Sequence, residues 1–290
     1  MNNESKGILL GLLAVTAFGL TLPTTHFVIP YLHPIFIGLG RAVVAALLAM
    51  IILLVSKQPL PTRQQLVPLC WIAFGVVIGF PVLSAWAMQS LPASHGGVVL
   101  GVLPIATVVF ATLITSERPS VGFWVTGIIG AVLVVTYSLI NGAGSFQAGD
   151  ILLVFAILSA AVGYAAGGHL AKEMGGWQVI CWALVIALPF ILIPAWLTAP
   201  ESLSELPISA TLSFLYLALI SQLLGFFAWY RGLALGGVAR VSQTQLLQPF
   251  VTIFASALLL GEPLTGLTLG FAVLVVITVA VSKKMPIHNK

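Results

Sequence analysis

Long apolar stretches alternate with short polar segments along almost the whole chain. Each stretch is long enough to cross the hydrocarbon core of a bilayer as a helix, which takes about 20 residues. The pattern predicts ten such helices, at residues 8–28, 33–55, 66–88, 95–116, 119–140, 150–171, 177–198, 209–230, 240–261 and 264–282. The expected fold class is an all-α polytopic membrane protein.

The ninth stretch carries a polar stripe. Ser242, Gln245, Pro249, Thr252 and Ser256 recur at steps of three and four, which places them on one face of a helix. An unpaired hydroxyl or amide in hydrocarbon costs roughly 1–3 kcal/mol, so this face should line a cavity. Because Pro249 cannot donate to the carbonyl of Gln245, polar groups should also gather near the middle of the span, as in broken transporter helices.

A second interpretation of the stripe stays open. Serine and threonine hydroxyls in membrane helices often bond their own backbone, without any ligand. The longer amides of Gln243, Gln245 and Gln248 need other partners. They either contact a substrate or hold neighbouring helices together.

The chain also repeats itself. An offset of 145 residues pairs Pro104 with Pro249, Thr107 with Thr252 and Glu117 with Glu262, and an offset of 143 pairs His26 with His169. The repeat divides the chain into residues 1–145 and 146–290, with five helices in each half. Since five is odd, the second half should be inverted relative to the first.

Composition and charge agree with this organisation. Hydrophobic residues make up 60% of the 290 residues and charged residues 6%, which excludes a soluble globular domain. If both termini are cytoplasmic, every loop lysine and arginine lies inside, and only Arg41 falls within a span. The net charge of +4 then reflects this bias and does not indicate nucleic-acid binding. The expected location is the inner (plasma) membrane, where the lipid bilayer surrounds the helices.

The acidic residues argue against an enzyme. The seven are Glu4, Glu117, Asp150, Glu173, Glu201, Glu205 and Glu262. All lie at or beyond span ends, and none is spaced with a histidine as a catalytic pair or a metal site. The sequence therefore predicts no catalytic residue, no metal and no cofactor.

Several of these features together resemble a known family. Pro34 followed by Arg41, the Pro104 to Glu117 segment, and the Pro249 segment that ends in Gly261-Glu262-Pro263 are similar to the drug/metabolite transporter superfamily, EamA-like branch. The similarity covers essentially the whole chain. It implies a ten-helix inverted-repeat exporter of amino acids or related metabolites, with both termini cytoplasmic. It also implies a cavity lined by helices one, three, four, six, eight and nine, with helices five and ten at the periphery.

A polar cavity without acidic side chains suits a neutral or zwitterionic small molecule, such as an amino acid, and aromatic surface suits a bulky or aromatic one. The candidate substrate-binding residues are Gln245, Gln248, Thr252 and Tyr164, and then Ser84, Trp86 and Thr21. The tryptophan and tyrosine rings are open to a second reading as anchors at the membrane interface.

Three ionisable residues and two prolines complete the set. Arg41, His26 and His169 are candidate gate or charge sites. The alternative for Arg41 is a purely structural charge, and the alternative for the two histidines is a position at the membrane interface. Pro104 and Pro249 are candidate hinges for alternating access. The expected function is export of such a metabolite. The alternatives are a non-transporting membrane regulator with the same fold, or an exporter of nucleosides or sugars. The sequence does not decide between a monomer and a homodimer.

Overall fold

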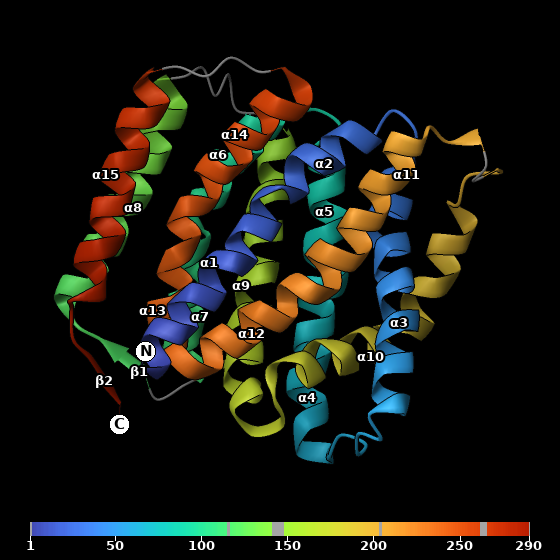
Figure 1. Cartoon of the computed structure of the whole chain (residues 1–290), viewed down its shortest axis with the longest axis horizontal. Helices are drawn as coiled ribbons and strands as arrows, with labels where there is room; N and C mark the ends of the chain where they lie inside the picture. Colours follow the sequence, from blue (N-terminus) through green and yellow to red (C-terminus); the bar gives the residue numbers. More distant parts are fainter. Residues whose placement is uncertain (1, 115–116, 141–147, 203–204, 262–265, 290) are drawn as a thin grey trace.

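The computed structural model describes residues 2–114, 117–140, 148–202, 205–261 and 266–289. Over these residues the chain is almost entirely helical, as predicted (Figure 1). The helices are α1 (Asn3–Gly19), α2 (Thr21–Val28), α3 (Arg41–Val55), α4 (Arg63–Ile72), α5 (Phe80–Ala87), α6 (Ala93–Val99), α7 (Leu103–Ile114), α8 (Val121–Ile140), α9 (Ala148–Met174), α10 (Gly176–Leu197), α11 (Ile208–Leu215), α12 (Gly225–Gly236), α13 (Val238–Ser242), α14 (Gln248–Leu260) and α15 (Gly266–Lys283).

Within the described residues, eight helical segments are long and apolar enough to cross a membrane, where the sequence predicted ten. They are Asn3–Val28, Phe36–Val55, Arg63–Ala87, Ala93–Ile114, Ala148–Met174, Gly176–Leu197, Ile208–Gly236 and Val238–Leu260. Two shorter apolar segments, Val121–Leu133 and Val273–Ser282, lie within α8 and α15. The architecture is that of a multi-pass membrane protein.

Two boundaries differ from the prediction for local reasons. The first helix begins at Asn3 because the side chain of Asn2 caps it, accepting a 2.8 Å hydrogen bond from the backbone N–H of Ser5. The eighth stretch continues to Gly236, and it ends there because Gly237 takes a φ of +83°, which continues no helix.

Both termini lie at one end of the molecule, here called the terminal end; the opposite end is called the distal end (Figure 1). At the terminal end β1 (Glu117–Pro119) and β2 (Ile287–Asn289) form an antiparallel pair. These strands were not predicted, because three-residue strands carry too little periodicity to recognise. α8 and α15 pack against each other at the periphery, where the resemblance placed helices five and ten (Figure 1).

The third span is interrupted between α4 and α5. Between them, Ala73–Gly79 is π-helical, and the N–H of Phe80 bonds the carbonyl of Gly75, five residues earlier. Two further π-helical segments are Phe36–Gly40, before α3, and Tyr216–Leu224, which joins α11 to α12. Shifted by 143 residues, Ala73–Gly79 falls inside Tyr216–Leu224, whereas Phe36–Gly40 falls inside α10.

The candidate hinges show the same correspondence. A 3₁₀ turn precedes each proline: the N–H of Leu103 bonds the carbonyl of Leu100 before Pro104, and the N–H of Gln248 bonds the carbonyl of Gln245 before Pro249. These two bonds are related by the offset of 145. In the second, the 3₁₀ bond satisfies the carbonyl that Pro249 cannot reach.

The first span breaks at Leu20, between α1 and α2. Pro23 has no N–H for the carbonyl of Gly19, which instead accepts a 2.8 Å hydrogen bond from the hydroxyl of Thr252. The carbonyl of Ala17 likewise accepts a 2.8 Å bond from the hydroxyl of Tyr216. Side chains of the second half therefore hold the break in the first helix.

Candidate functional site

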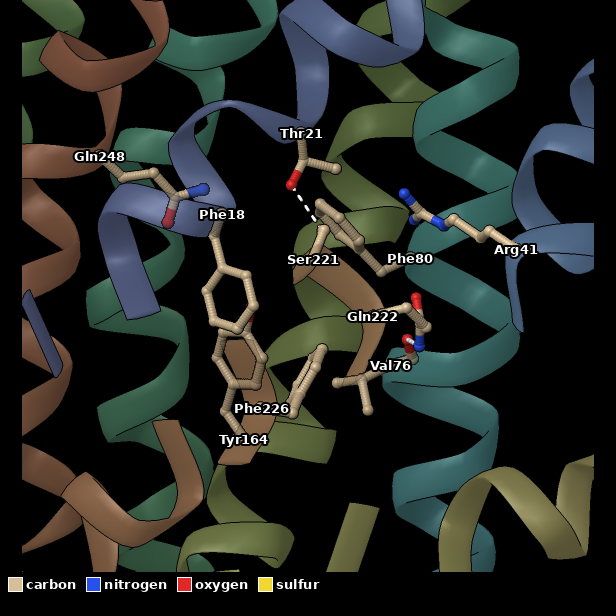
Figure 2. A pocket seen from close by; sticks show the side chains of 10 residues that line it. All are labelled: Phe18, Thr21, Arg41, Val76, Phe80, Tyr164, Ser221, Gln222, Phe226 and Gln248. Atoms are coloured by element: carbon tan, nitrogen blue, oxygen red, sulfur yellow. Dashed lines mark hydrogen bonds between the residues drawn. The ribbon is translucent and has the colours of Figure 1, made fainter. Parts of the chain in front are cut away.

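A narrow enclosed cavity lies at the centre of the bundle (Figure 2). Its ten lining residues are Phe18, Thr21, Arg41, Val76, Phe80, Tyr164, Ser221, Gln222, Phe226 and Gln248. The first five come from the first half of the chain and the last five from the second. Movement of one half against the other would therefore open or close this space.

The polar part of the lining joins the halves directly. The hydroxyls of Thr21 and Ser221 lie 2.8 Å apart, and either one can donate the hydrogen bond (Figure 2). Gln222 donates its Nε2 proton to the carbonyl of Val76 at 3.0 Å. In the π-helical register of Ala73–Gly79 that carbonyl would pair with residue 81, which is a proline without an N–H. Gln222 thus takes the bond that Pro81 cannot make.

Arg41 reaches the cavity from the start of α3 (Figure 2). Helix two approaches helix three closely here: a Cβ on Gly38 would lie 2.9 Å from the Cα of Val82. The arginine is 2% exposed, and its Nε and Nη1 have no hydrogen-bond partner among the described residues. Burying an unpaired ion costs several kcal/mol, so this side chain lies in an energetically poor environment.

Gln248 faces Arg41 from the other side of the lining in Figure 2. It is the first residue of α14 and is 3% exposed. Its Oε1 has no hydrogen-bond partner within the part of the chain that the structure describes. The cavity therefore contains an unused acceptor as well as an unused donor group.

Aromatic rings form the remaining wall. The ring centroids of Phe18 and Phe226 lie 4.9 Å apart, and those of Tyr164 and Phe226 lie 5.9 Å apart. Trp229 packs behind them, with its ring 5.1 Å from that of Tyr164. This cluster offers apolar and polarisable surface beside the polar groups, an arrangement typical of small-molecule sites.

The cavity is closed in this structure. The space between the lining side chains is so narrow that it has room for about one water molecule. Any larger molecule therefore requires the lining helices to separate.

The structure brings four of the predicted site residues together in the lining: Thr21, Arg41, Tyr164 and Gln248. Gln245 and Thr252 are buried outside it, Thr252 because its hydroxyl holds the carbonyl of Gly19. The amide of Gln245 has no partner at either atom among the described residues. Most of the stripe on the ninth helix therefore packs against neighbouring helices, and Gln248 alone of the predicted helix-nine residues contributes to the cavity lining.

The remaining candidates lie elsewhere. Ser84 is buried and bonds the carbonyl of Pro81 at 3.3 Å, whereas Trp86 is 40% exposed at the surface. His26 is half-buried, with its Nδ1 3.2 Å from the carbonyl oxygen of Met88. His169 is half-buried near the C-terminus of α9. Pro104 and Pro249 lie in the helical part of their spans, directly after the 3₁₀ turns.

Sequence reasoning missed six lining residues. They are Phe18, Val76, Phe80, Ser221, Gln222 and Phe226. Ser221 and Gln222 form an isolated polar pair inside an apolar span, which was a usable signal. The helices that line the cavity also differ from those that the resemblance implied. Helix two contributes Arg41, and helix four contributes no residue.

A second polar contact closes the distal end. His95, near the start of α6, and Asp150, in the first turn of α9, lie with Nε2 and Oδ1 2.5 Å apart and are largely buried. The sequence analysis asked only about catalytic pairs and metal sites, and it did not predict this contact. The two residues are 55 positions apart and meet because both helices begin at this end.

A helical bundle that crosses a membrane many times and closes around a polar, aromatic-lined cavity is the architecture of a membrane transporter. Comparison with known proteins defines this class further. Residues 5–139 and 147–283 each match the EamA-like transporter family. The chain belongs to that family, within the drug/metabolite transporter superfamily.

Individual relatives extend over nearly the whole chain. It is 39% identical to the uncharacterized transporter YdeK of Bacillus subtilis, over 98% of this chain and 99% of that one. It is 28% identical to a probable amino-acid metabolite efflux pump of Salmonella typhimurium, over 92% of this chain and 91% of that one. A solved crystal structure of 16% identity shares the fold with a TM-score of 0.74 and covers 96% of this chain and 98% of its own. The protein is a transporter and not an enzyme.

Proposed function

We propose that the protein exports small neutral or zwitterionic metabolites, above all amino acids, across the plasma membrane. The observation that carries this proposal is the central cavity, which both halves build and which combines hydroxyl, amide and guanidinium groups with an aromatic wall. Two relatives named as a probable amino-acid metabolite efflux pump and a probable terminal-alkyne amino-acid exporter support the substrate class. The aromatic wall favours substrates with a bulky or aromatic side chain.

The proposed topology is ten spans in two inverted repeats of five, residues 1–145 and 146–290, with both termini cytoplasmic. Three observations support it: the two separate family matches, the equivalent π-helical segments, and the equivalent 3₁₀ turns before Pro104 and Pro249. The loop lysines and arginines also gather at the terminal end, as the positive-inside rule requires of a cytoplasmic face.

Thiol labelling of intact cells tests this orientation. Cys70 is exposed and is first replaced by serine, so that it does not contribute a signal. A cysteine at Glu201, exposed at the distal end, is expected to react with an impermeant maleimide from outside. A cysteine at Leu60, which is 80% exposed at the terminal end, is expected to react only after the cells are opened. The reverse labelling pattern would rule out the proposed orientation.

Transport proceeds in this proposal by alternating access. The lining residues divide evenly between the halves, and the contact between His95 and Asp150 at the distal end would be a gate that opens on that side. Rocking of one repeat against the other would expose the same cavity to either face in turn, with the breaks before Pro104 and Pro249 as hinges.

Counterflow in proteoliposomes, with amino acids, nucleosides and sugars as labelled compounds, tests the function and separates it from a non-transporting regulator. Gln248→Leu is expected to lower transport of the identified substrate by 10-fold or more, because a hydrogen bond to a charged group contributes about 1.5–3 kcal/mol. Leucine keeps a similar volume and removes the amide.

Gln245→Leu is the matched control for that substitution. Gln245 lies three residues away in the same buried segment but outside the cavity, and both of its amide atoms lack partners among the described residues. Its replacement is expected to leave transport unchanged and stability unchanged or higher. Equal losses of transport in the two variants, or a loss in Gln245→Leu alone, would contradict the placement of the site.

A further inference from the structure

Arg41 is the only cation among the cavity-lining residues, and the membrane-spanning part of the chain offers it no counter-ion. No aspartate or glutamate occurs within a predicted span at its depth, since all seven acids lie at or beyond span ends. Ion pairs among the described residues include His95 with Asp150 and Arg240 with Glu4, and neither of these involves Arg41. The guanidinium is 2% exposed and points into the cavity (Figure 2).

A structural arginine would be expected to use its five donors on backbone carbonyls or carboxylates. In this structure Nε and Nη1 of Arg41 have no hydrogen-bond partner among the described residues. Other polar groups of the same lining do pair with one another: Thr21 bonds Ser221, and Gln222 bonds the carbonyl of Val76. Within the lining, the polar side-chain atoms left without a partner among the described residues are therefore Nε and Nη1 of Arg41 and Oε1 of Gln248.

We propose that Arg41 is the anchor for the carboxylate of the transported compound, which the guanidinium would bind through two parallel N–H···O bonds. This inference rests on the proposed export function and narrows it: a recognised compound must carry an anionic group, so amines, sugars and nucleosides are excluded. One positive charge balances one negative charge, so a monoanionic carboxylate matches the site better than a doubly charged phosphate.

The remaining lining residues fit the rest of such a compound. Gln248, on the opposite side in Figure 2, presents an unpartnered Oε1 that can accept a hydrogen bond from an ammonium group. Phe18, Tyr164 and Phe226 provide aromatic surface for a side chain. The carboxylate anchor, the ammonium acceptor and the aromatic wall together describe an α-amino acid.

The first test measures the stability of the ligand-free carrier in detergent. Cys181 is buried in the core, so a thiol-reactive dye reports its exposure on heating once Cys70 is replaced by serine. Arg41→Met is expected to raise the Tm by about 3 °C or more, because it removes an uncompensated charge from a site built for a ligand. Gln222→Met, the matched control, is expected to lower the Tm, because it leaves the carbonyl of Val76 without a donor. A fall in Tm for Arg41→Met would show a structural arginine and overturn the proposal.

The second test uses the same assay with defined probes: the proteinogenic amino acids, each beside its carboxamide, together with phenylpropionate, phenethylamine, phenyl phosphate, glucose and uridine. Amino acids that raise the Tm of the wild-type carrier are expected to have no such effect on Arg41→Met and a partial effect on Arg41→Lys. On the wild-type carrier, each of these amino acids is expected to bind with an apparent affinity at least 10-fold higher than that of its carboxamide. A carboxamide, amine, sugar or nucleoside that stabilises as well as the amino acid would overturn the proposal, as would stronger stabilisation by phenyl phosphate.

These results are separable from those on export itself. An amino acid that binds through Arg41 but is not moved in counterflow would refute the proposed export and leave the anchor standing. Undiminished counterflow in Arg41→Met would refute the anchor and leave export standing.

Discussion

Gly75→Ala is expected to lower the Tm of the carrier by about 6–12 °C, the equivalent of roughly 3 kcal/mol. Helix propensity alone predicts the opposite sign, since alanine is about 1 kcal/mol better than glycine inside a helix. Packing decides the outcome. A Cβ at Gly75 would lie 2.4 Å from the backbone carbonyl oxygen of Ser159 in α9, and backbone cannot rotate away as a side chain can.

Relief of that contact requires the π-helical segment and α9 to move apart by about 1 Å. The movement would also weaken the 3.0 Å bond from the hydroxyl of Ser159 to the carbonyl of Gly75. Gly75→Leu should therefore prevent recovery of folded protein altogether.

Gly270→Ala is the control, because no atom lies within 4 Å of a Cβ at this exposed glycine of α15. It is expected to leave the Tm unchanged or slightly higher. Thermal unfolding followed through Cys181 measures both variants. A neutral Gly75→Ala would mean that helices three and six are not packed as closely as described.

The architecture was predictable because hydropathy acts over about 20 residues at a time. Nearly all backbone polar groups inside a bilayer must pair within their own helix, so a long apolar run has few alternatives to a helix. The breaks were predictable for a related reason: Pro23 and Pro81 each remove a backbone donor at a known position. Local rules thus located the spans and the irregular segments.

The partners of the freed groups were not predictable, because they are distant in sequence. The hydroxyl of Thr252 pairs with the carbonyl of Gly19, 233 residues away, and Gln222 pairs with that of Val76, 146 residues away. A polar stripe that faces a cavity and one that faces a broken helix look alike in sequence. For this reason Gln245 and Thr252 were predicted as ligands of a substrate, although the structure places both outside the cavity.

Arg41 is a residue whose functional role the sequence left undecided and whose surroundings in the structure favour one. The sequence left its role open between a structural charge and a functional one, since both are compatible with a lone arginine in a span. Only the three-dimensional arrangement shows that its Nε and Nη1 lack partners among the described residues and that aromatic and amide groups surround the same space. His95 and Asp150 were missed for a similar reason, because the neighbourhood of α6 and α9 is a property of the fold.

The contact between His95 and Asp150 predicts that the distal end can be locked by a metal ion. Asp150→Cys, with Cys70 replaced by serine, is expected to create a carrier that micromolar Zn²⁺ inhibits more than 10-fold. Nε2 of His95 and Oδ1 of Asp150 lie 2.5 Å apart. A cysteine sulfur lies one bond nearer its own backbone than Oδ1 does, which leaves space for an ion with Zn–N and Zn–S bonds of about 2.1 and 2.3 Å.

Such a bridge would tie α6 of the first half to α9 of the second. In the proposed alternating-access mechanism, release at the distal face requires these helices to separate. Counterflow of the substrate identified in the screen is measured with Zn²⁺ and again after EDTA, which is expected to restore transport. Asp150→Cys combined with His95→Ala lacks one ligand and should be insensitive, as should the wild-type carrier at the same concentration. If Zn²⁺ leaves Asp150→Cys fully active, or inhibits the double variant equally, the two halves do not part at this contact during transport.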